Sequence, residues 1–478
     1  MLKRSYVKNK FDQWSDVVYD ITIDSRKVKE KSLFIAYKGY ALNGHEFIKQ
    51  AIENGATTIL LEDENYINDS NINFILVNNA KILLGEIASA FYDNPSSSLK
   101  VVGITGTNGK TTVASLLHNL FFNLGFKSGL LSTIINKVGE KELSTNLTTP
   151  DAISIQKMFR QMVDEGVEYV FMEVSSHALD QGRVSNVQFD IAVFTNISRD
   201  HLDYHDTFLD YINAKRKLFN DLPKSAKALV NIDDVNGKIM IQNSKANVVT
   251  YALRKPADFK VKILSNSIEG LHLVMQGHEV YLKLIGDFNA YNAMAVYGVA
   301  TMLGIDEMEV LTTLSNLIAI EGRMDIVKSD VKGITGVIDY AHTPDALEQV
   351  LTTIAELNIQ KGRIITVVGC GGNRDKGKRP LMGKIASRLS TITVLTSDNP
   401  RDENPNVIIE EMMEGVEKEN EEKVVKIENR KEAIKMAALM AKPGDIILIA
   451  GKGHEKYQEI KGQKLPFNDK KIFSAFMH

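Results

Sequence analysis

The chain has 478 residues, of which 44% are hydrophobic and 24% are charged, a balance typical of soluble globular proteins. At about 150 residues per domain, this length predicts about three domains. The 57 Lys and Arg against 60 Asp and Glu give a net charge of -3, which argues against a generally basic nucleic-acid-binding protein. The single cysteine, Cys370, excludes an intrachain disulfide and a cysteine-based zinc site, and we interpret it as a small residue packed at a strand end. The first 14 residues lack the apolar core of a signal peptide and no apolar run approaches ~20 residues, so we expect a cytoplasmic protein without membrane insertion.

The N-terminal part of the chain alternates short strand-like runs with helical patches, and Pro95 followed by three serines then breaks the pattern. We therefore predict a first domain over residues 1–97. The strands are expected at LFIAYKG (33–39) and TTILLE (57–62), and the helices at HEFIKQAIENGA (45–56) and KILLGEIASAFYD (81–93).

The rest of the chain repeats a strand–turn–helix order, which predicts mostly parallel sheets with helices on both faces. We expect a central P-loop domain over residues 98–322 and a C-terminal Rossmann-like domain over residues 323–478, so the predicted fold class is α/β with three domains. Four strand candidates, ITGVIDY, RIITVVG, ITVLTSD and DIILIAG, follow residue 323. The stretch 417–432 mixes both charge signs and is interpreted as a solvated surface segment.

The segment GITGTNGKTT (103–112) carries the clearest chemical signal, because it follows a strand and opens a helix, as a phosphate-binding loop requires. Gly106 and Gly109 let backbone N–H groups point at phosphate oxygens, Lys110 can reach the terminal phosphates and the Thr111 hydroxyl can ligate Mg²⁺. The spacing departs from the common G-x4-G-K-T pattern, since five residues separate Gly103 from Gly109. A fortuitous glycine turn before a helix is the alternative.

The variant TGTNGKTT resembles the Mur ligase family of ATP-dependent amide-forming enzymes. Ordered matches extend over nearly the whole chain, through DSRKVKEKSLFIAYKG (24–39), LTTP (147–150), MEVSSHALDQGRV (172–184), FTNISRDHLDYH (194–205), NAKRKLF (213–219), GDFNAYNAMA (286–295), DYAHTPDAL (339–347), GGNRDKGKRPLM (371–382), DNPRDENP (398–405) and GKGHE (451–455). The resemblance implies a uridine-binding N-terminal domain and the addition of meso-2,6-diaminopimelate to UDP-N-acetylmuramoyl-L-alanyl-D-glutamate through an acyl phosphate, in peptidoglycan synthesis.

Four side chains are expected to perform the chemistry: Lys110, Glu173, His201 and Lys215. Glu173 ends one strand and His201 follows another, where ligands sit in open α/β sheets. The resemblance implies that both hold Mg²⁺ with Thr111, and that Lys215 is carbamylated (N6-carboxylysine) and ligates a second Mg²⁺. Without the resemblance, Glu173 would be interpreted as a helix-capping acid, His201 as a hydrogen-bonded loop residue and Lys215 as a solvated lysine.

The resemblance also implies the binding residues for the nucleotides and the muramyl-dipeptide. An ordinary surface turn remains the alternative for residues 43–45, and Leu147 stands where many relatives carry Asn. The residues expected to bind ATP are Gly106, Thr107, Asn108, Gly109, Lys110, Thr111, Thr112, Asn292, Arg323, Asp339 and His342. Those expected to bind UDP-MurNAc-dipeptide are Ser25, Arg26, Asn43, His45, Thr148, Thr149, Ser175, Gln181 and Arg183.

The choice of amino acid is expected to depend on Arg401, because a guanidinium can bind a carboxylate through two hydrogen bonds. Diaminopimelate differs from lysine by one carboxylate, and the sequence DNPR resembles that of diaminopimelate-adding members. A β-turn that serves only geometry is the alternative. The full expected set is Arg374, Asp398, Asn399, Pro400, Arg401, Gly451 and Glu455.

Other functions remain open from the sequence. They are an L-lysine-adding ligase, a folylpolyglutamate synthetase (disfavoured by the uridine-binding region), an inactive ATP-binding regulatory protein and a nucleic-acid-translocating P-loop ATPase, which the charge balance does not support. We expect small-molecule substrates only, no nucleic acid, and a monomer.

Overall fold

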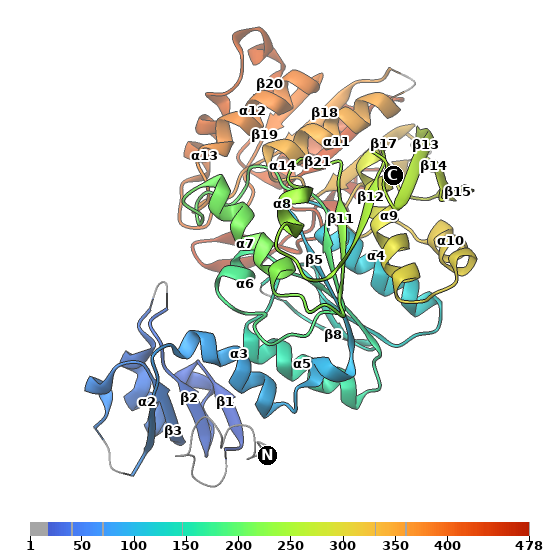
Figure 1. The fold of residues 1–478 in the computed structure, drawn as a ribbon. Helices are drawn as coiled ribbons and strands as arrows, with labels where there is room; N and C mark the ends of the chain where they lie inside the picture. Colours follow the sequence, from blue (N-terminus) through green and yellow to red (C-terminus); the bar gives the residue numbers. More distant parts are fainter. Residues whose placement is uncertain are drawn as a thin grey trace.

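A computed structural model describes residues 18–39, 42–68, 71–145, 147–329, 331–358 and 361–477. The chain forms three α/β domains in succession, each with its own main sheet, and the central domain lies between the other two (Figure 1). None of the helices in these ranges is long and apolar enough to cross a membrane. The domain boundaries at residues 97 and 322 stay predictions.

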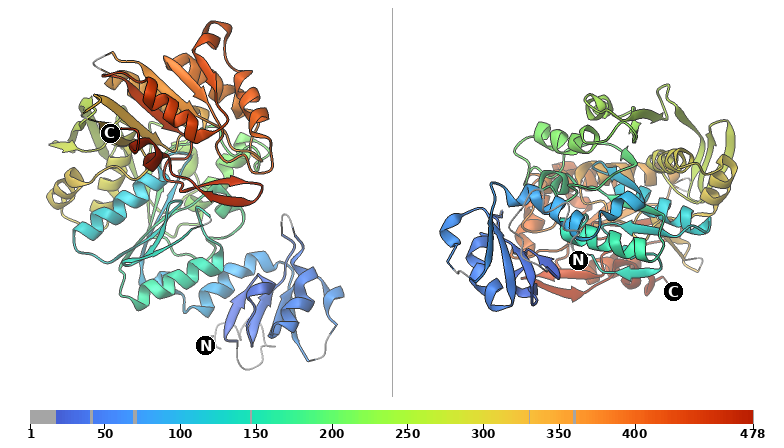
Figure 2. Two further views of the ribbon diagram at one scale, coloured as in Figure 1. Left: turned by 180° about the vertical axis from the view of Figure 1, so that it is seen from behind. Right: turned by 60° about the horizontal axis from the view of Figure 1, so that its bottom comes forward.

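The N-terminal domain is a parallel sheet in the order β1-β2-β3-β4. Its helix α3 lies along α5 of the central domain, as both views in Figure 2 show. The first predicted strand is shorter than expected, because β2 ends at Ile35. The elements are β1 (Asp20–Thr22), β2 (Ser32–Ile35), α2 (Ile48–Glu53), β3 (Ala56–Leu61), β4 (Asn73–Leu76) and α3 (Ala80–Phe91).

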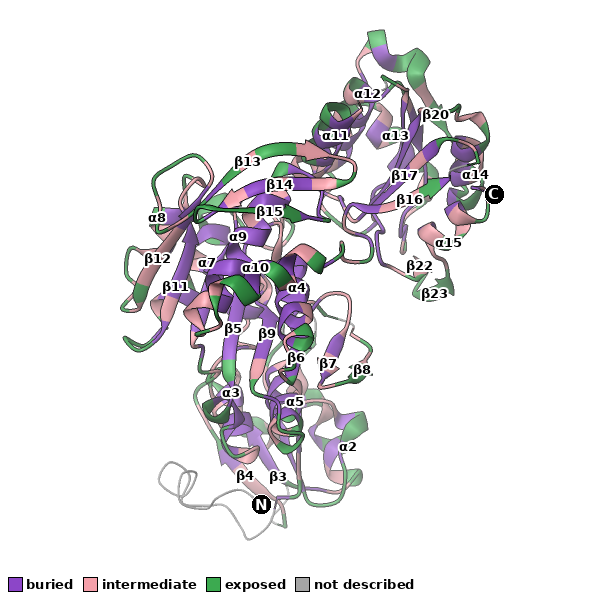
Figure 3. Cartoon of the chain, turned by 90° about the vertical axis from the view of Figure 1, so that its right-hand side faces the viewer, coloured by how far each residue is buried: buried purple, intermediate pink, exposed green. Residues whose placement is uncertain are grey.

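The central domain contains an eleven-stranded sheet in the order β15-β14-β13-β12-β11-β10-β5-β9-β6-β7-β8, parallel from β13 to β6 and antiparallel at both ends. In β5, Val102 and Ile104 pack against α4, α9 and α10, whereas Val101 packs on the opposite side with α5 and α7. Both faces are covered, so the inner strands are largely buried (Figure 3), as expected for the continuous apolar runs of a parallel sheet. The strands are β5 (Lys100–Thr105), β6 (Ser128–Leu131), β7 (Asn136–Val138), β8 (Lys141–Leu143), β9 (Tyr169–Glu173), β10 (Ile191–Phe194), β11 (Lys227–Asn231), β12 (Asn247–Ala252), β13 (Phe259–Ser267), β14 (Gly270–Met275) and β15 (His278–Leu282); the helices are α4 (Lys110–Asn123), α5 (Ala152–Asp164), α6 (Ser176–Asp180), α7 (Phe208–Asn220), α8 (Gly237–Ile241), α9 (Asp287–Met302) and α10 (Glu307–Asn316).

The C-terminal domain has a six-stranded sheet in the order β16-β17-β21-β18-β19-β20, in which only β16 runs antiparallel to its neighbour. Helices α11, α12 and α13 cover one face, and α14 and α15 cover the other. Cys370 is buried two residues beyond β18, which confirms its predicted packing. The elements are β16 (Asp325–Ser329), β17 (Ile334–Asp339), α11 (Pro344–Leu357), β18 (Ile364–Val368), α12 (Lys378–Leu389), β19 (Ile392–Leu395), α13 (Pro405–Met413), β20 (Val424–Lys426), α14 (Arg430–Met440), β21 (Ile446–Ala450), β22 (Tyr457–Ile460), β23 (Gln463–Pro466) and α15 (Asp469–Ser474).

The interpretation of residues 417–432 as a solvated segment is wrong at Arg430. This side chain is fully buried and forms an ion pair with Asp469 of α15, with 2.7 Å between Nη2 and Oδ2. The pairing explains the burial, because a guanidinium enters the interior when a carboxylate satisfies its donors. The partner lies 39 residues further along the chain, where no local pattern points to it.

Candidate active site

The predicted phosphate loop lies between the end of β5 and the start of α4, and its two glycines are sterically required. Gly106 has φ +153°, and a Cβ atom there would lie 1.9 Å from Thr195 Oγ1. Gly109 has φ +87°, and its Cβ would lie 2.6 Å from Asn292 Oδ1. Asn292, a predicted ATP residue, therefore lies directly against the loop at Gly109. Helix α4 begins at Lys110, so the free N–H groups of its first turn lie at the loop.

Two lysines converge on one backbone carbonyl of this loop. Lys110 Nζ donates to Gly106 O at 2.9 Å and to Thr107 O at 2.7 Å, and Lys215 Nζ donates to Gly106 O at 2.8 Å. Lys215 is buried, and its ammonium lies 4.6 Å from the centroid of the Tyr211 ring. Burial lowers the pKa of both lysines, and the charge of Lys110 lowers the pKa of Lys215 further. The two amino groups therefore lie together on neutral oxygens, and the solvated-lysine alternative for Lys215 is wrong because this side chain is buried.

Glu173 and His201 lie at the same edge of the sheet as the lysines. Glu173 is fully buried at the end of β9, and its carboxylate accepts hydrogen bonds from Thr133 N at 2.7 Å and Thr133 Oγ1 at 3.2 Å. His201 has φ +55° and directly follows Asp200. Burial lowers its pKa, and the charges of Lys215 and Lys110 add to this effect. The neutral imidazole that results has a lone pair for a metal ion or a proton.

The predicted linker and C-terminal residues reach this site from the other side. Arg323 Nη2 donates to Thr111 Oγ1 at 3.2 Å, and its guanidinium lies 4.4 Å from the Tyr340 ring centroid. The Asp339 carboxylate accepts from the backbone N–H groups of residues 324 and 341, both at 2.7 Å, so it fixes the linker. His342 Nδ1 lies 2.9 Å from the Tyr340 carbonyl oxygen, and burial lowers the pKa of His342 to about 4.

Asp345 is a contact that sequence reasoning missed. Its carboxylate, in the first turn of α11, accepts hydrogen bonds from Asn108 Nδ2 at 3.1 Å and Ser198 Oγ at 3.0 Å. Asn108 is also held from the central sheet, because its N–H donates to Asn196 Oδ1 at 3.0 Å. An acid after Thr-Pro is an ordinary sign of a helix start, so the local sequence masks this contact between domains.

The residues predicted for the muramyl-dipeptide gather beyond the end of β9. Thr149 Oγ1 donates to Glu173 O at 2.8 Å, and it lies 3.3 Å from Ser175 Oγ. Arg183 Nη1 donates to Thr149 O at 2.9 Å, and its Nε donates to Gln181 Oε1 at 3.0 Å. Thr148 Oγ1 lies 3.1 Å from Thr133 Oγ1, which ties the set to the strand end that holds Glu173.

The residues predicted for the uridine end lie in the N-terminal domain and are engaged in local contacts. Ser25 Oγ donates to Gln50 Oε1 at 2.6 Å, and Arg26 forms an exposed ion pair with Asp24 at 2.9 Å. His45 Nδ1 donates to Asn43 Oδ1 at 2.8 Å, while its Nε2 accepts from the N–H of residue 62 at 3.0 Å. Both ring nitrogens of His45 are therefore engaged, one within the turn and one at the end of β3, which favours a structural role for its ring.

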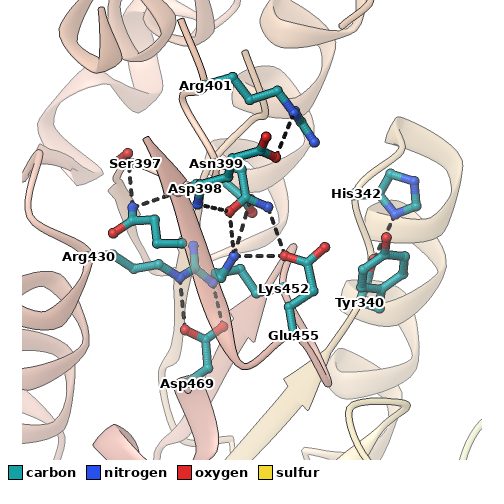
Figure 4. A network of polar contacts seen from close by, with 12 residues as sticks. Tyr340, His342, Ser397, Asp398, Asn399, Arg401, Arg430, Lys452, Glu455 and Asp469 are labelled. Atoms are coloured by element: carbon teal, nitrogen blue, oxygen red, sulfur yellow. Dashed lines mark hydrogen bonds and ion pairs between the residues drawn. The ribbon is translucent and has the colours of Figure 1, made fainter. Parts of the chain in front are cut away.

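The residues predicted for the incoming amino acid form a polar cluster in the C-terminal domain (Figure 4). Asn399 Nδ2 donates to Glu455 Oε2 at 2.8 Å. Arg401 has φ +52°, donates from Nη1 to the carbonyl of residue 372 at 2.8 Å, and lies 3.2 Å from a Glu459 carboxylate oxygen. Gly451 has φ +110°, and a Cβ there would lie 2.6 Å from Asp398 Oδ2.

Two further observations complete this cluster. Arg374 is exposed and lies close to Gly371, since a Cβ atom added at Gly371 would be 3.7 Å from Arg374 Cγ. Lys452, which sequence reasoning did not single out, is fully buried and bonds to both Asn399 and Glu455. The motif GKGHE pointed to this segment, but the sequence alone predicts an exposed lysine there because it does not show the partners of Lys452.

Comparison with known proteins gives matches over all three domains. Three family models match in order: "Mur ligase family, catalytic domain" at residues 17–92, "Mur ligase middle domain" at 104–300 and "Mur ligase, glutamate ligase domain" at 322–453. A protein of Bacteroides thetaiotaomicron named UDP-N-acetylmuramoyl-L-alanyl-D-glutamate--2,6-diaminopimelate ligase is 49% identical over 458 residues, which are 96% of this chain and 95% of that protein.

Solved structures agree with these matches. A structure of a UDP-N-acetylmuramoyl-L-alanyl-D-glutamate--2,6-diaminopimelate ligase has a TM-score of 0.67 and 34% identity, over 96% of this chain and 94% of that chain. The MurF ligase of Thermotoga maritima in complex with ADP has a TM-score of 0.66 at 19% identity, over 96% and 97%, and so shares the fold. With matches over nearly its whole length in sequence and in structure, this chain belongs to the Mur ligase family.

Proposed function

We propose that this chain is an ATP-dependent carbon–nitrogen ligase that adds meso-2,6-diaminopimelate to UDP-N-acetylmuramoyl-L-alanyl-D-glutamate. The observation that carries the choice of amino acid is that Arg401, held by the carbonyl of residue 372 and by Glu459, belongs to the same polar cluster as the Asn399–Glu455 pair. A guanidinium and a carboxylate on one cluster complement the carboxylate and ammonium at the distal end of diaminopimelate. The relatives named for this reaction support the same choice.

The reaction proceeds in two steps. An oxygen of the D-glutamate side-chain carboxylate attacks the γ-phosphorus of ATP, the bond to the bridging oxygen breaks, and ADP leaves. The amine of diaminopimelate then attacks the acyl phosphate, loses a proton, and expels inorganic phosphate as the amide forms. Lys110 lies on the phosphate loop, so its charge stabilises the phosphoryl group in transit.

The C-terminal domain completes the nucleotide site in this proposal. Arg323 contacts Thr111 at the start of α4, and Asp345 contacts Asn108 in the loop, so both act where the phosphates bind. Closure of this domain excludes water from the acyl phosphate, which would otherwise hydrolyse. The remaining predicted ATP residues, Asn292, Asp339 and His342, shape the loop and the linker around the nucleotide.

We further propose that the site holds Mg²⁺ with ATP, through Thr111, Glu173 and His201, and that carbamylated Lys215 takes part in a second site. The donor set fits: a buried carboxylate, a hydroxyl and a neutral imidazole are oxygen and nitrogen ligands. Lys215 fits carbamylation, because a buried amine with a lowered pKa is a nucleophile for CO₂ and the carbamate would carry the negative charge that a metal needs. Bound Mg²⁺ would offset the charge of the two polyanionic substrates.

The muramyl-dipeptide is proposed to bind over the ends of β9 and α6, where Thr148, Thr149, Ser175, Gln181 and Arg183 converge. The UDP end is proposed to reach the N-terminal domain near Ser25, Arg26 and the turn that contains Asn43 and His45. We propose that the enzyme acts in the cytoplasm as a monomer on these small molecules, without nucleic acid.

Phosphate release by the purified protein tests the proposal. With UDP-MurNAc-L-Ala-D-Glu, ATP and Mg²⁺, diaminopimelate should give turnover and L-lysine at the same concentration should give little. Lysine-dependent release without diaminopimelate-dependent release would identify the lysine-adding ligase instead. ATP binding without release in the presence of either amino acid would favour the inactive regulatory protein.

A further inference from the structure

We infer that Lys452 is a positioning residue for the incoming amino acid: its buried ammonium fixes Asn399 and Glu455 in the one arrangement that presents Glu455 Oε1 to the distal ammonium of the substrate. The inference rests on the proposed function, because it concerns the amino-acid site of that reaction. It adds to that site a residue that does not itself face the substrate.

The first observation is a closed set of hydrogen bonds around Lys452. Its Nζ donates to Asn399 Oδ1 at 2.9 Å and to Glu455 Oε2 at 2.8 Å, and it lies 3.9 Å from Asp398 Oδ1. Asn399 Nδ2 donates to the same oxygen, Glu455 Oε2, at 2.8 Å. Two donors therefore fall on one oxygen of the carboxylate, so Oε1 is the oxygen that this inference assigns to the substrate ammonium.

The orientation of the Asn399 amide is determined by this set. Its Oδ1 accepts from Lys452 and from the N–H of Glu459 at 2.9 Å. A flipped amide would place its NH₂ group against an ammonium and a backbone N–H, which have no acceptor to offer. The nitrogen must therefore face Glu455, so Lys452 sets the geometry of both side chains at once.

The second observation is that Arg430 of α14 holds the segment that carries Lys452. Arg430 is fully buried, donates from Nε and Nη2 to Asp469 at 2.9 and 2.7 Å, and donates from Nη2 to Ala450 O at 2.8 Å. Ala450 ends β21, two residues before Lys452. The end of β21 is thus linked to α14 and α15 through Arg430 and Asp469, and this link fixes the position of the backbone near Lys452.

The third observation is the balance of charge in the cluster. Lys452 is 0% exposed, whereas the Glu455 side chain is 16% exposed, so the cation lies beneath the carboxylate that faces the site. Removal of one partner from a buried ionic set leaves the others without compensation. Without Lys452, Glu455 and Asp398 would repel each other and Asn399 would lose one of the two donors that orient it. The consequence should fall on the amino-acid site, because the contacts that hold the C-terminal residues proposed for ATP, Arg323, Asp339 and His342, do not include Lys452.

Steady-state kinetics of Lys452→Met test this inference, because methionine keeps most of the side-chain volume and removes the ammonium. We expect KM for diaminopimelate to rise at least 30-fold, with KM for ATP and for the UDP-substrate changed less than threefold. Lys456→Met is the matched control, since Lys456 lies in the same loop, is exposed and pairs only with Glu321 in the described structure, at 3.5 Å. It should change no KM more than twofold. A similar rise in all three KM values for Lys452→Met would overturn the inference.

A double-mutant cycle with Glu455→Gln separates positioning from general stability. If Lys452 acts through Glu455, adding Lys452→Met to Glu455→Gln should cost less than threefold in kcat/KM for diaminopimelate, and full additivity refutes it. If Lys452→Met does not fold, Lys452→Gln retains an N–H donor and should show a smaller rise confined to the same KM; an unchanged value refutes the inference. Wild-type turnover with diaminopimelate is measured first and tests the proposed function alone. If another amino acid supports turnover instead, the same comparison is made with that amino acid.

Discussion

Asp345 joins the C-terminal domain to the phosphate loop, and Asp345→Ala should weaken the use of ATP. The substitution removes hydrogen bonds to Asn108 Nδ2 at 3.1 Å and Ser198 Oγ at 3.0 Å. A hydrogen bond to a charged group contributes about 1.5–3 kcal/mol, and the burial that raises the pKa of Asp345 offsets part of this. We therefore expect a net loss of about 2 kcal/mol, or about 30-fold in kcat/KM for ATP, measured by phosphate release.

Asp345→Asn is the control, because its amide oxygen can still accept one of the two bonds, and it should lose less than tenfold. The pKa of Asp345 is raised in the folded protein, so protonation on acidification occurs there before it would in the unfolded chain. Any stability that this shift contributes is present at low pH and is lost as pH rises through the raised pKa. The difference in activity between wild type and Asp345→Asn should thus narrow as pH falls. Activity of Asp345→Ala within threefold of wild type would refute the coupling between domains.

Three further substitutions test other parts of the structure. Gly109→Ala forces a side chain to φ +87° and toward Asn292 Oδ1, so KM for ATP should rise at least tenfold with little change for the UDP-substrate; an unchanged KM contradicts the loop geometry. Arg401→Ala should lower kcat/KM for diaminopimelate about 100-fold without lowering any turnover of lysine, and undiminished diaminopimelate turnover would remove the basis for that substrate. Arg430→Met leaves Asp469 buried and unpaired, so urea unfolding should show a loss of about 3–5 kcal/mol. Arg430→Met combined with Asp469→Leu should regain most of that loss, and a small effect of the single change would indicate that the pair adds no stability.

The phosphate loop and the parallel strands were predictable because their signals are local. Glycines at a strand end before a helix, and apolar runs covered on both faces, are set by neighbours in the sequence. Lys215, Arg430 and Lys452 could not be placed in the same way, since each is buried by a partner from a distant segment. Lysine and arginine are usually exposed, so the pattern around them predicts solvent. The family resemblance implies a role for Lys215, but its burial and its contact with the phosphate loop are visible only in the structure.

The same resemblance grouped residues that the structure treats differently. Asp339 stays a predicted ATP residue, and its carboxylate accepts from the N–H of residue 324 in the linker and from that of residue 341 after β17. Asp345, six residues further on, was not expected and makes the contact with the loop. Motif similarity identifies the segment that approaches a site, whereas the side chain that reaches it depends on how strand β17 and helix α11 are joined. A residue-by-residue transfer is therefore weakest where a motif crosses such a junction.

The net charge of -3 conceals two different environments for basic side chains. In the C-terminal domain, Arg430 and Lys452 are compensated by carboxylates, so this side of the site is electrically satisfied before a zwitterionic amino acid binds. At the phosphate loop, Lys110 and Lys215 donate to backbone carbonyls; burial lowers the pKa of both, and the charge of Lys110 lowers the pKa of Lys215 further. A desolvated cation on neutral oxygens gains most from an incoming anion. The asymmetry thus favours the polyanionic nucleotide on one side of the domain contact and a small neutral molecule on the other.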